Sequence, residues 1–269
     1  MTPPWGPYTA LVLAGSRCGE DDPVARYRGA VHKCLVEADG VPLLVRVVST
    51  LAASARVGGL LVLLDDPRLA DGLPQLARLR VEGRLRVLPS APSLARSVTR
   101  ALAAAGPPLL VTTGDHPLLT PGMVGHFLDA ADASGAEVAV GLTSASVIRA
   151  RYPGSGRTYL HFRGGAYSGA NLFALRDGPA ARRAAGFWRR VERDRKRPWR
   201  LVRALGPALL LAYLSRLLTL PQVMAAASRR LGVRVAAVPL PFAEAAIDVD
   251  KPSDLDLVEG ILASRRSCA

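Results

Sequence analysis

The chain has 269 residues, enough for one large α/β domain or two small ones. Hydrophobic residues make up 49% of it and charged residues 21%, a composition that excludes wholesale disorder. Lys and Arg number 35 against 22 Asp and Glu, which gives a formal net charge of +13. We therefore expect an anionic substrate or partner, such as a nucleotide, a nucleic acid or a lipid headgroup.

The cysteine content and the apolar runs indicate the compartment. Cys18, Cys34 and Cys268 form neither a disulfide framework nor a zinc-binding pattern, which predicts a reducing environment. The first seven residues lack the basic and apolar regions of a signal peptide. No apolar run reaches the ~18 residues of a membrane-spanning helix. We expect a cytoplasmic protein whose membrane contact, if present, is peripheral and at the inner face.

Apolar, β-prone runs in the first half alternate with segments of helical spacing. The runs predict strands over residues 8–14, 59–64, 85–88, 108–112 and 137–142. The spacing predicts helices over residues 41–55, 93–105 and 120–133. This alternation is typical of an α/β fold with a parallel, doubly wound sheet covered by helices on both faces. Ligands bind such sheets beyond the carboxyl ends of the strands, so loops 15–33 and 114–117 should be neighbours.

The second half has a different composition. Strands are predicted over residues 158–162, 170–175 and 233–238, and a closing helix over 252–263. Between them, residues 182–203 hold ten basic side chains against Glu192 and Asp194, a net charge of +8. We interpret residues 176–231 as a basic helical insertion within a single domain that spans residues 1–269.

The loop after the first strand is a candidate phosphate-binding loop. Gly15 allows close approach of the backbone, and the Lys and Arg side chains that follow can neutralise a triphosphate. A flexible loop with solvated charges is the alternative. The loop contains neither a Walker sequence nor G-x-G-x-x-G. Lys33 is the only lysine before Lys196, which suggests that a compact charge is required there, and we expect it at the loop surface.

Two acidic segments are candidate metal ligands. Asp115 follows an apolar central strand in the sequence TTGDHP, where a carboxylate suits Mg²⁺; the alternative is that it caps the turn before Pro117. Asp248 and Asp250 are two residues apart and share a face if the preceding strand continues, so either could complete the site. Asp254 is better explained by the first turn of the last helix.

These pieces occur together and in order, and the chain resembles the MobA-like nucleotidyltransferases. This NTP transferase superfamily also includes the cytidylyltransferases of isoprenoid and polyol phosphate metabolism. The resemblance covers roughly residues 8–175 and 232–264. It rests on four segments: Leu13-Ala14-Gly15-Ser16-Arg17 with Lys33 and residues 40–44; Asp115 in TTGDHPLLT; residues 248–255; and Ser168-Gly169-Ala170-Asn171. The loop before Lys33 is longer than usual, and the basic insertion has no counterpart in the better-known members.

The resemblance implies a Rossmann-like three-layer α/β/α fold with a mostly parallel mixed sheet. It also implies transfer of a nucleoside monophosphate from an NTP to a phosphorylated small-molecule or lipid-like acceptor, with Mg²⁺ and release of pyrophosphate. The implied catalytic residues are Lys33, Arg17 and Asp115, and the implied metal ligands are Asp115, Asp248 and Asp250. Those implied for nucleotide binding are Leu13, Ala14, Gly15, Ser16, Arg26, Lys33, Ser97 and Gly114. Gly169 and Asn171 are implied for acceptor binding.

Two interpretations are open for the base of the nucleotide, and two for the basic insertion. Ser97, in residues 94–102, resembles a cytidylyltransferase helix start and favours CTP, whereas an ordinary amphipathic helix capped by Ser93 is the alternative. The insertion could dock on an anionic membrane or form a solvated basic face. The competing function is a basic protein that binds nucleic acid or a membrane surface without catalysis. Aromatic residues are only 5% of the chain, so we expect no specific nucleic acid.

Overall fold

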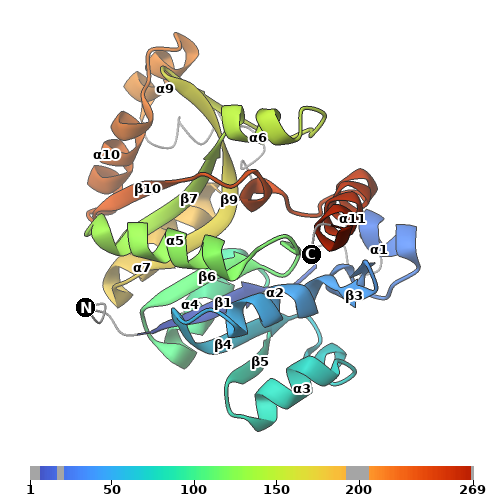
Figure 1. Cartoon of the computed structure of the whole chain (residues 1–269). Helices are drawn as coiled ribbons and strands as arrows, with labels where there is room; N and C mark the ends of the chain where they lie inside the picture. The colour runs from blue at the N-terminus through green and yellow to red at the C-terminus, as the bar shows by residue number, and fades with distance from the viewer. Residues whose placement is uncertain (1–6, 17–20, 192–205, 268–269) are drawn as a thin grey trace.

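The computed structural model describes residues 7–16, 21–191 and 206–267. Within these ranges an eight-stranded sheet has the order β10-β7-β9-β6-β1-β4-β5, with β8 paired to β9 (Figure 1). Strand β9 is antiparallel to β6 and β7, whereas the path's other pairs are parallel. The predicted mostly parallel mixed sheet is confirmed. Its strands are β1 (Tyr8–Leu13), β4 (Val57–Leu64), β5 (Leu85–Pro89), β6 (Leu109–Thr113), β7 (Val138–Ser144), β8 (Leu160–Phe162), β9 (Gly165–Leu175) and β10 (Val235–Leu240).

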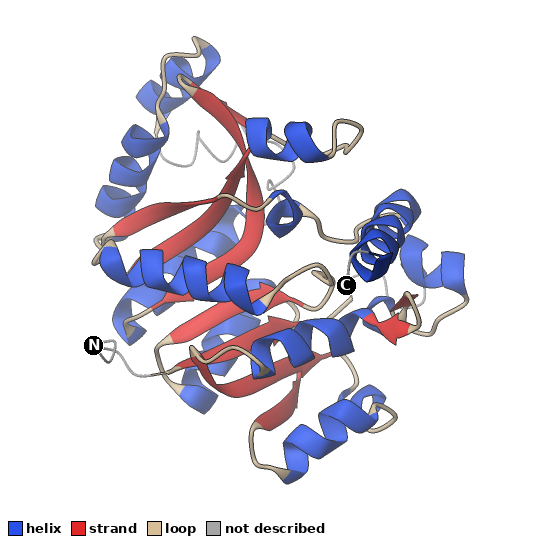
Figure 2. Cartoon of the chain, in the orientation of Figure 1, coloured by secondary structure: helices blue, strands red, loops and turns tan. Residues whose placement is uncertain are grey.

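Helices cover both faces of the sheet, which confirms the three-layer α/β/α fold (Figure 2). On one face, Leu44 and Phe127 are fully buried in a core cluster with the strands. On the other face, Val98 and Ala181 pack against Leu11 and its neighbours. The first layer holds α2 (Leu43–Ala52), α3 (Pro74–Val81) and α5 (Pro121–Ala133); the second holds α4 (Leu94–Ala105) and α7 (Gly178–Val191).

The boundaries differ from the predicted ones where local pairing competes with helix spacing. The helix expected from residue 41 begins at Leu43, because β2 (Glu37–Ala38) and β3 (Val41–Pro42) form a short hairpin ahead of it. Helices α1 (Pro23–Arg28), α3 and α6 (Ala145–Arg151) were not predicted. Helix α1 has a visible start signal, since the Asp22 side chain accepts from the Val24 amide and Pro23 occupies the first turn.

The predicted strand does not continue to the acidic pair near the C-terminus. Strand β10 ends at Leu240, and a 3-10 helix, Ala243–Ala246, follows it. Asp248 and Asp250 therefore lie in irregular backbone, and the condition under which they would share one face of a strand is not met. What holds this segment in place is the Val249 amide, which donates to the Asp115 carbonyl at 2.9 Å.

The start of the predicted basic insertion is integral to the fold. Helix α7 buries Ala180, Ala181 and Ala185 in the second core layer. Trp188 packs edge-on against Phe173 of β9, with ring centroids 4.4 Å apart, so this ring contacts the sheet. Helices α9 (Pro207–Leu214) and α10 (Leu220–Leu231) complete the segment. Residues 192–205, which carry +4 of the +8 counted in residues 182–203, lie outside the described residues.

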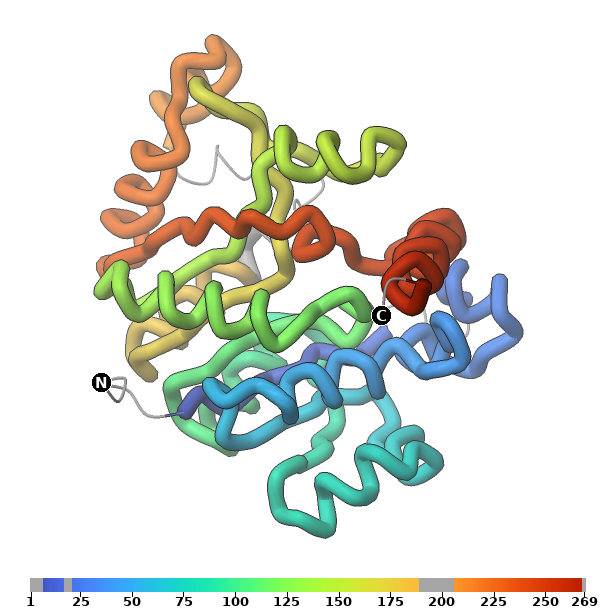
Figure 3. Tube along the Cα trace, viewed as in Figure 1, coloured from blue at the N-terminus to red at the C-terminus, as the bar shows by residue number. Residues whose placement is uncertain are grey.

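The last helix, α11 (Pro252–Ser267), lies beside α1, so the segment that follows β1 and the C-terminal helix meet at one side of the sheet (Figure 3). Arg28 pairs with Glu259 across this contact, and the Tyr27 hydroxyl donates to Asp256 at 3.4 Å. A separate apolar cluster, with Val24 and Leu255 fully buried, lies beneath. None of the helices in the described ranges has both the length and the apolar character needed to cross a bilayer.

Candidate active site

The carboxyl ends of β1 and β6 meet as predicted. The Gly114 amide donates to the Leu13 carbonyl at 2.9 Å, and a Cβ on Gly114 would lie 3.0 Å from both Ala14 Cβ and Cys34 Sγ. A side chain at position 114 would therefore press against the neighbouring loop, so glycine favours this close contact. The same contact brings a set of charged side chains together, which we call the Lys33 cluster: Lys33, Asp115, Arg157, Asp248 and Asp250.

Lys33 lies at the centre of this cluster. It begins a 3-10 helix, Lys33–Leu35, whose cap is His32, with Nδ1 accepting from the Cys34 amide at 3.1 Å. The Lys33 ammonium donates to Asp115 Oδ2 and, at 3.3 Å, to Asp250 Oδ1. Its side chain is only 13% exposed, so the expectation of a surface position is wrong. Burial favours the neutral amine, but Asp115 and Asp250 outweigh it and raise the lysine's pKa.

Asp115 is the carboxylate that Lys33 compensates. Burial alone would raise its pKa, but the Lys33 charge and hydrogen bond hold that pKa below the usual range. Its other oxygen, Oδ1, is buried and has no hydrogen-bond partner among the described residues. The adjacent His116 is also buried, and this burial lowers its pKa to about 4, so the imidazole is neutral near pH 7. A buried carboxylate with one unused oxygen can accept a further ligand.

Asp248 is held from two sides. Arg157 donates to its Oδ1 and, at 2.9 Å, to its backbone carbonyl, while Asn171 Nδ2 donates to Oδ2 at 2.8 Å. Burial raises the pKa of Asp248 to about 6, and the nearby Asp115 and Asp250 charges add to the effect. The position of this carboxylate is thus well defined, but its negative charge is poorly compensated.

Arg157 was missed by the sequence reasoning. It lies in the loop between α6 and β8, which is rich in Gly and Pro and contains no recognisable motif. Its side chain is 8% exposed and also donates to Asp254 Oδ1 at 3.1 Å. Asp254 in turn accepts from the Asp250 and Lys251 amides, at 3.1 and 3.2 Å, which supports its expected place in the first turn of α11. The sequence gives no local signal for Arg157, because its partners lie about 90 residues away in the chain.

Asn171 reaches Asp248 through an irregularity in β9. The pairing of β6 with β9 ends at Val111 and Phe173, and the register of β7 with β9 shifts between Val140 and Leu142. Asn171 lies in this interruption with a φ of 49°, in the left-handed region that Asn tolerates better than most residues. Such an irregularity in a strand re-aims a side chain, and here it directs the amide to the site.

Gly15 is confined by its neighbours. A Cβ there would lie 2.8 Å from Asp65 Oδ1 and 3.0 Å from Ser90 Oγ, and the Ser16 amide donates to Asp65 Oδ2 at 2.5 Å. The sequence reasoning assigned this glycine to the approach of a ligand. The structure shows that the absence of a side chain also leaves room for Asp65 and Ser90, which would have to shift if a Cβ were present.

Four other predicted residues lie outside the Lys33 cluster or outside the described ranges. Arg26 is exposed on α1 and pairs with Asp21 at 3.7 Å. Ser97 is buried and its hydroxyl accepts from the Ala91 amide at 3.0 Å. Gly169 is exposed on β9, with open space where a Cβ would be. Arg17 lies outside the described residues, and the functional roles of all four stay predictions.

The acidic residues of the Lys33 cluster could supply oxygen ligands to a metal ion. No group of three or more His, Cys, Asp or Glu side chains in the described parts of the chain is arranged to hold a metal. One or two carboxylates are nevertheless what Mg²⁺ takes from a protein when substrate phosphates supply the other ligands. The unused Asp115 Oδ1 and the poorly compensated Asp248 are oxygen donors that fit such an ion.

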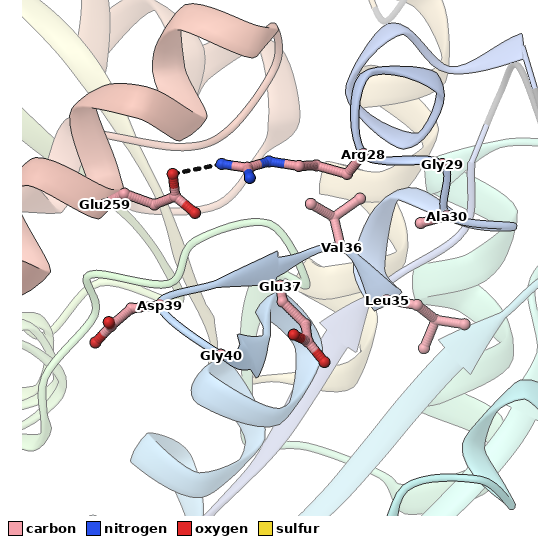
Figure 4. A pocket seen from close by; sticks show the side chains of 9 residues that line it. All are labelled: Arg28, Gly29, Ala30, Leu35, Val36, Glu37, Asp39, Gly40 and Glu259. Carbon is pink, nitrogen blue, oxygen red and sulfur yellow. Dashed lines mark hydrogen bonds and ion pairs between the residues drawn. The ribbon is translucent and has the colours of Figure 1, made fainter.

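A cavity of about 400 Å³ opens beside α1 and α11 (Figure 4). Glu37, Asp39 and Glu259 line it together with Arg28. Three carboxylates facing one arginine would repel a triphosphate. None of the residues of the Lys33 cluster lines this cavity.

Comparisons with known proteins establish the family. The family model for the MobA-like NTP transferase domain matches residues 10–237, and the chain belongs to this family. A structure described as a hypothetical transferase from Thermus thermophilus is 33% identical, with a TM-score of 0.75 over 93% of this chain and 99% of that one. The protein is therefore a nucleotidyltransferase. The matched range includes the segment predicted as an insertion.

More distant structures share the fold. The 4-diphosphocytidyl-2C-methyl-D-erythritol synthase of Anaerococcus prevotii is 10% identical, with a TM-score of 0.56 over 96% of both chains. The synthetase of CMP:2-keto-3-deoxy-manno-octonic acid, solved with CTP, is 17% identical, with a TM-score of 0.54 over 96% of this chain and 99% of that one. A search of curated proteins finds no match.

Proposed function

We propose that this nucleotidyltransferase moves a nucleoside monophosphate from an NTP to a phosphorylated small-molecule or lipid-like acceptor. The observation that carries the proposal is the Lys33 cluster, in which a buried ammonium and poorly compensated carboxylates meet at the carboxyl ends of β1 and β6. Clusters of this kind, with shifted pKa values at the ligand-binding edge of an α/β sheet, are typical of functional sites.

The reaction needs positioning and charge neutralisation more than covalent help from the protein. An acceptor oxygen attacks the α-phosphorus in line, a new P–O bond forms, and the bond to the β-phosphate oxygen breaks to release pyrophosphate. The Lys33 ammonium is placed to exchange its Asp250 contact for a phosphate oxygen and to neutralise the leaving pyrophosphate. We propose that the loop of Leu13, Ala14, Gly15 and Ser16 contacts the nucleotide, and that Gly114 packs against the start of this loop. Arg17 and Arg26 are the proposed cations of the loop.

Mg²⁺ is part of the proposal, with Asp115 and either Asp248 or Asp250 as its protein ligands. The bound ion would neutralise charge on the phosphates as a Lewis acid. Arg157 and Asn171 hold Asp248 at a fixed orientation, which prepares that carboxylate without a rearrangement. On the acceptor side we propose Asn171 and Gly169, since both lie on the part of β9 that reaches the site.

For the base we propose CTP. Its support is the resemblance of the Ser97 segment to cytidylyltransferases, since the distant structures show the fold alone. This choice would be overturned if the protein bound GTP or ATP with tenfold higher affinity than CTP, a difference of about 1.4 kcal/mol in binding free energy.

Pyrophosphate release tests the reaction. Each of the four NTPs is combined with Mg²⁺ and with phosphorylated sugars, polyols or lipids, and pyrophosphate is measured with and without the acceptor. We expect acceptor-dependent release that the variant Asp115→Asn lacks. Equal release by this variant in its folded state would remove Asp115 from the site. If no acceptor stimulates release although NTP binds, the acceptor class is wrong and not the nucleotide site.

A further inference from the structure

The charge of this protein is divided sharply along the chain. Residues 138–243 contain 19 Lys and Arg but only three Asp and Glu, a net charge of +16, so the remaining residues together carry a net −3. The basic range comprises β7 to β10 with α6, α7, α9 and α10. Between residues 206 and 243 there is no acidic residue at all. The net positive charge is therefore concentrated in this part of the chain, which we call the positive half; its α9 end lies opposite the end of the molecule that carries α3 (Figure 1).

The tip of the positive half is apolar. Helix α9 has the sequence PALLLAYL and contains no buried residue. Leu211, Leu214 and Leu217 are 68%, 64% and 60% exposed, and together they account for half of the large hydrophobic side chains exposed in the described part of the chain. We call these three leucines the α9 ridge. Solitary exposed apolar side chains are common, but three within seven residues form a surface that water disfavours.

The α9 ridge is held in a fixed position by the opposite side of its own helix. Leu209, Leu210 and Tyr213 pack around the buried Leu218 and Val223, next to Phe162 of β8. The rings of Tyr213 and Phe162 lie 6.3 Å apart. The exposed leucines therefore lie on the outer side of a folded segment whose opposite side is packed against the protein. Exposed arginines flank it, among them Arg216 in the following turn and Arg163, whose amide donates to the Leu218 carbonyl at 2.8 Å.

We propose that the α9 ridge docks the enzyme on the surface of an anionic membrane. Leucines that enter the apolar boundary and arginines that meet the headgroups are the combination that peripheral amphipathic segments use. Helix α9 has eight residues, far too few to span a bilayer, so the attachment is interfacial. The exposed arginines beside the ridge, among them Arg163 and Arg216, supply the charge complementarity, because each basic side chain near an anionic surface is worth about 1 kcal/mol.

Docking there would orient the active site toward the membrane at a defined distance. Strand β9 runs from Gly165, beside the Phe162 contact, to Asn171 in the active site. Six residues of strand span about 20 Å. A membrane-borne substrate with a headgroup of that reach could enter the site while the enzyme stays attached.

Cosedimentation with vesicles tests the docking surface. The full chain is mixed, without nucleotide, with phosphatidylcholine vesicles that contain phosphatidylglycerol and, separately, with pure phosphatidylcholine vesicles at physiological salt. The test is independent of the proposed reaction because no turnover is measured. We expect binding to the anionic vesicles only, and at least tenfold weaker binding for the double variant Leu211→Ser/Leu214→Ser. Arg216→Ser should weaken binding about fivefold.

Val81→Ser provides the matched control, since Val81 is 90% exposed on α3, at the end of the molecule opposite α9. It should bind like the wild type, and circular dichroism should show that all variants are folded. Absence of wild-type binding, or equal loss in Val81→Ser and the ridge variant, overturns the proposal. A dimer in analytical ultracentrifugation that only the ridge variants lose, without vesicle binding, would instead assign the ridge to a second copy of the chain.

Discussion

Two buried charged clusters lie at opposite ends of the sheet and differ in how their charges are compensated. At the amino end of β1, Asp132 accepts from the Tyr8 hydroxyl at 2.8 Å and pairs with Arg56 and Arg176. Arg176 also donates to three carbonyls near the end of α5, at 3.2 to 3.3 Å. We call this the Asp132 cluster. One buried carboxylate there faces two guanidinium groups and a phenol.

The Lys33 cluster has the opposite balance. Asp115, Asp248 and Asp250 face Lys33 and Arg157, and the mutual repulsion of the acids contributes to the raised pKa of Asp248. In the Asp132 cluster, burial and the bond to Asp132 raise the pKa of Tyr8, so that phenol stays neutral at every physiological pH. The comparison teaches that a buried cluster whose carboxylate is fully paired contributes to stability. A cluster with excess negative charge can instead bind an additional cation, or its cation can change partners.

The largest expected effect separates the two clusters by activity. Asp115→Asn should lower turnover by at least a hundredfold, because a charge-stabilising contact of this type is worth several kcal/mol in the transition state. The measurement is the rate of pyrophosphate release by folded protein. Asp132→Asn, also folded, should retain its rate and its NTP affinity. A similar loss in both variants would mean that the two clusters are not functionally distinct.

The second effect reverses that contrast. Asp132→Asn should lower the free energy of unfolding by about 3 kcal/mol, since two buried guanidinium groups lose their shared carboxylate. Urea denaturation at pH 7 measures it. A change under about 0.5 kcal/mol, the size usual for surface positions, would contradict a structural role for the Asp132 cluster.

The third effect concerns pH. The pKa of Asp248 is about 6 in the folded protein, above the ~3.9 of an unfolded Asp, so its ionisation opposes folding. Stability from this group is present below pH 4 and is lost as the pH rises through 6. We expect Asp248→Asn to gain on the order of 2 kcal/mol relative to the wild type between pH 4 and pH 7. Urea denaturation in EDTA at both pH values measures this, and a pH-independent difference would refute the poor compensation of Asp248.

The smallest effect tests the interruption in β9. Asn171→Ala and Asn171→Gly both remove the hydrogen bond to Asp248, but alanine also bears the strain of a φ of 49°. The alanine variant should be less stable than the glycine variant by about 1 kcal/mol. Thermal denaturation compares the two. Equal stability would show that the backbone relaxes out of the left-handed region.

Sequence patterns predict which loops form this site better than they predict how its charges are compensated. Apolar strands that end in polar loops predicted that Gly15, Asp115 and Lys33 approach one another, because parallel strands present their carboxyl ends at one edge. The burial of Lys33 was not predictable, since it depends on Asp250 arriving from 217 residues away. The role of Arg157 and the interruption at Asn171 could not be predicted either, because they too depend on contacts between residues far apart in the chain. Local spacing shows which loops meet, and only tertiary packing shows which charges remain uncompensated.

The contact between α1 and α11 has a consequence for the synthesis of this chain. Asp248 and Asp250 follow all the strands of the described sheet in the chain, and the helix that contacts α1 through Glu259 comes after them, so they leave the ribosome later than those strands. A nascent chain can pair β1, β4 and β6 long before then, but its Lys33 and Arg157 still lack their C-terminal carboxylates. The Lys33 cluster can therefore be completed only after the strands that position it have been synthesised.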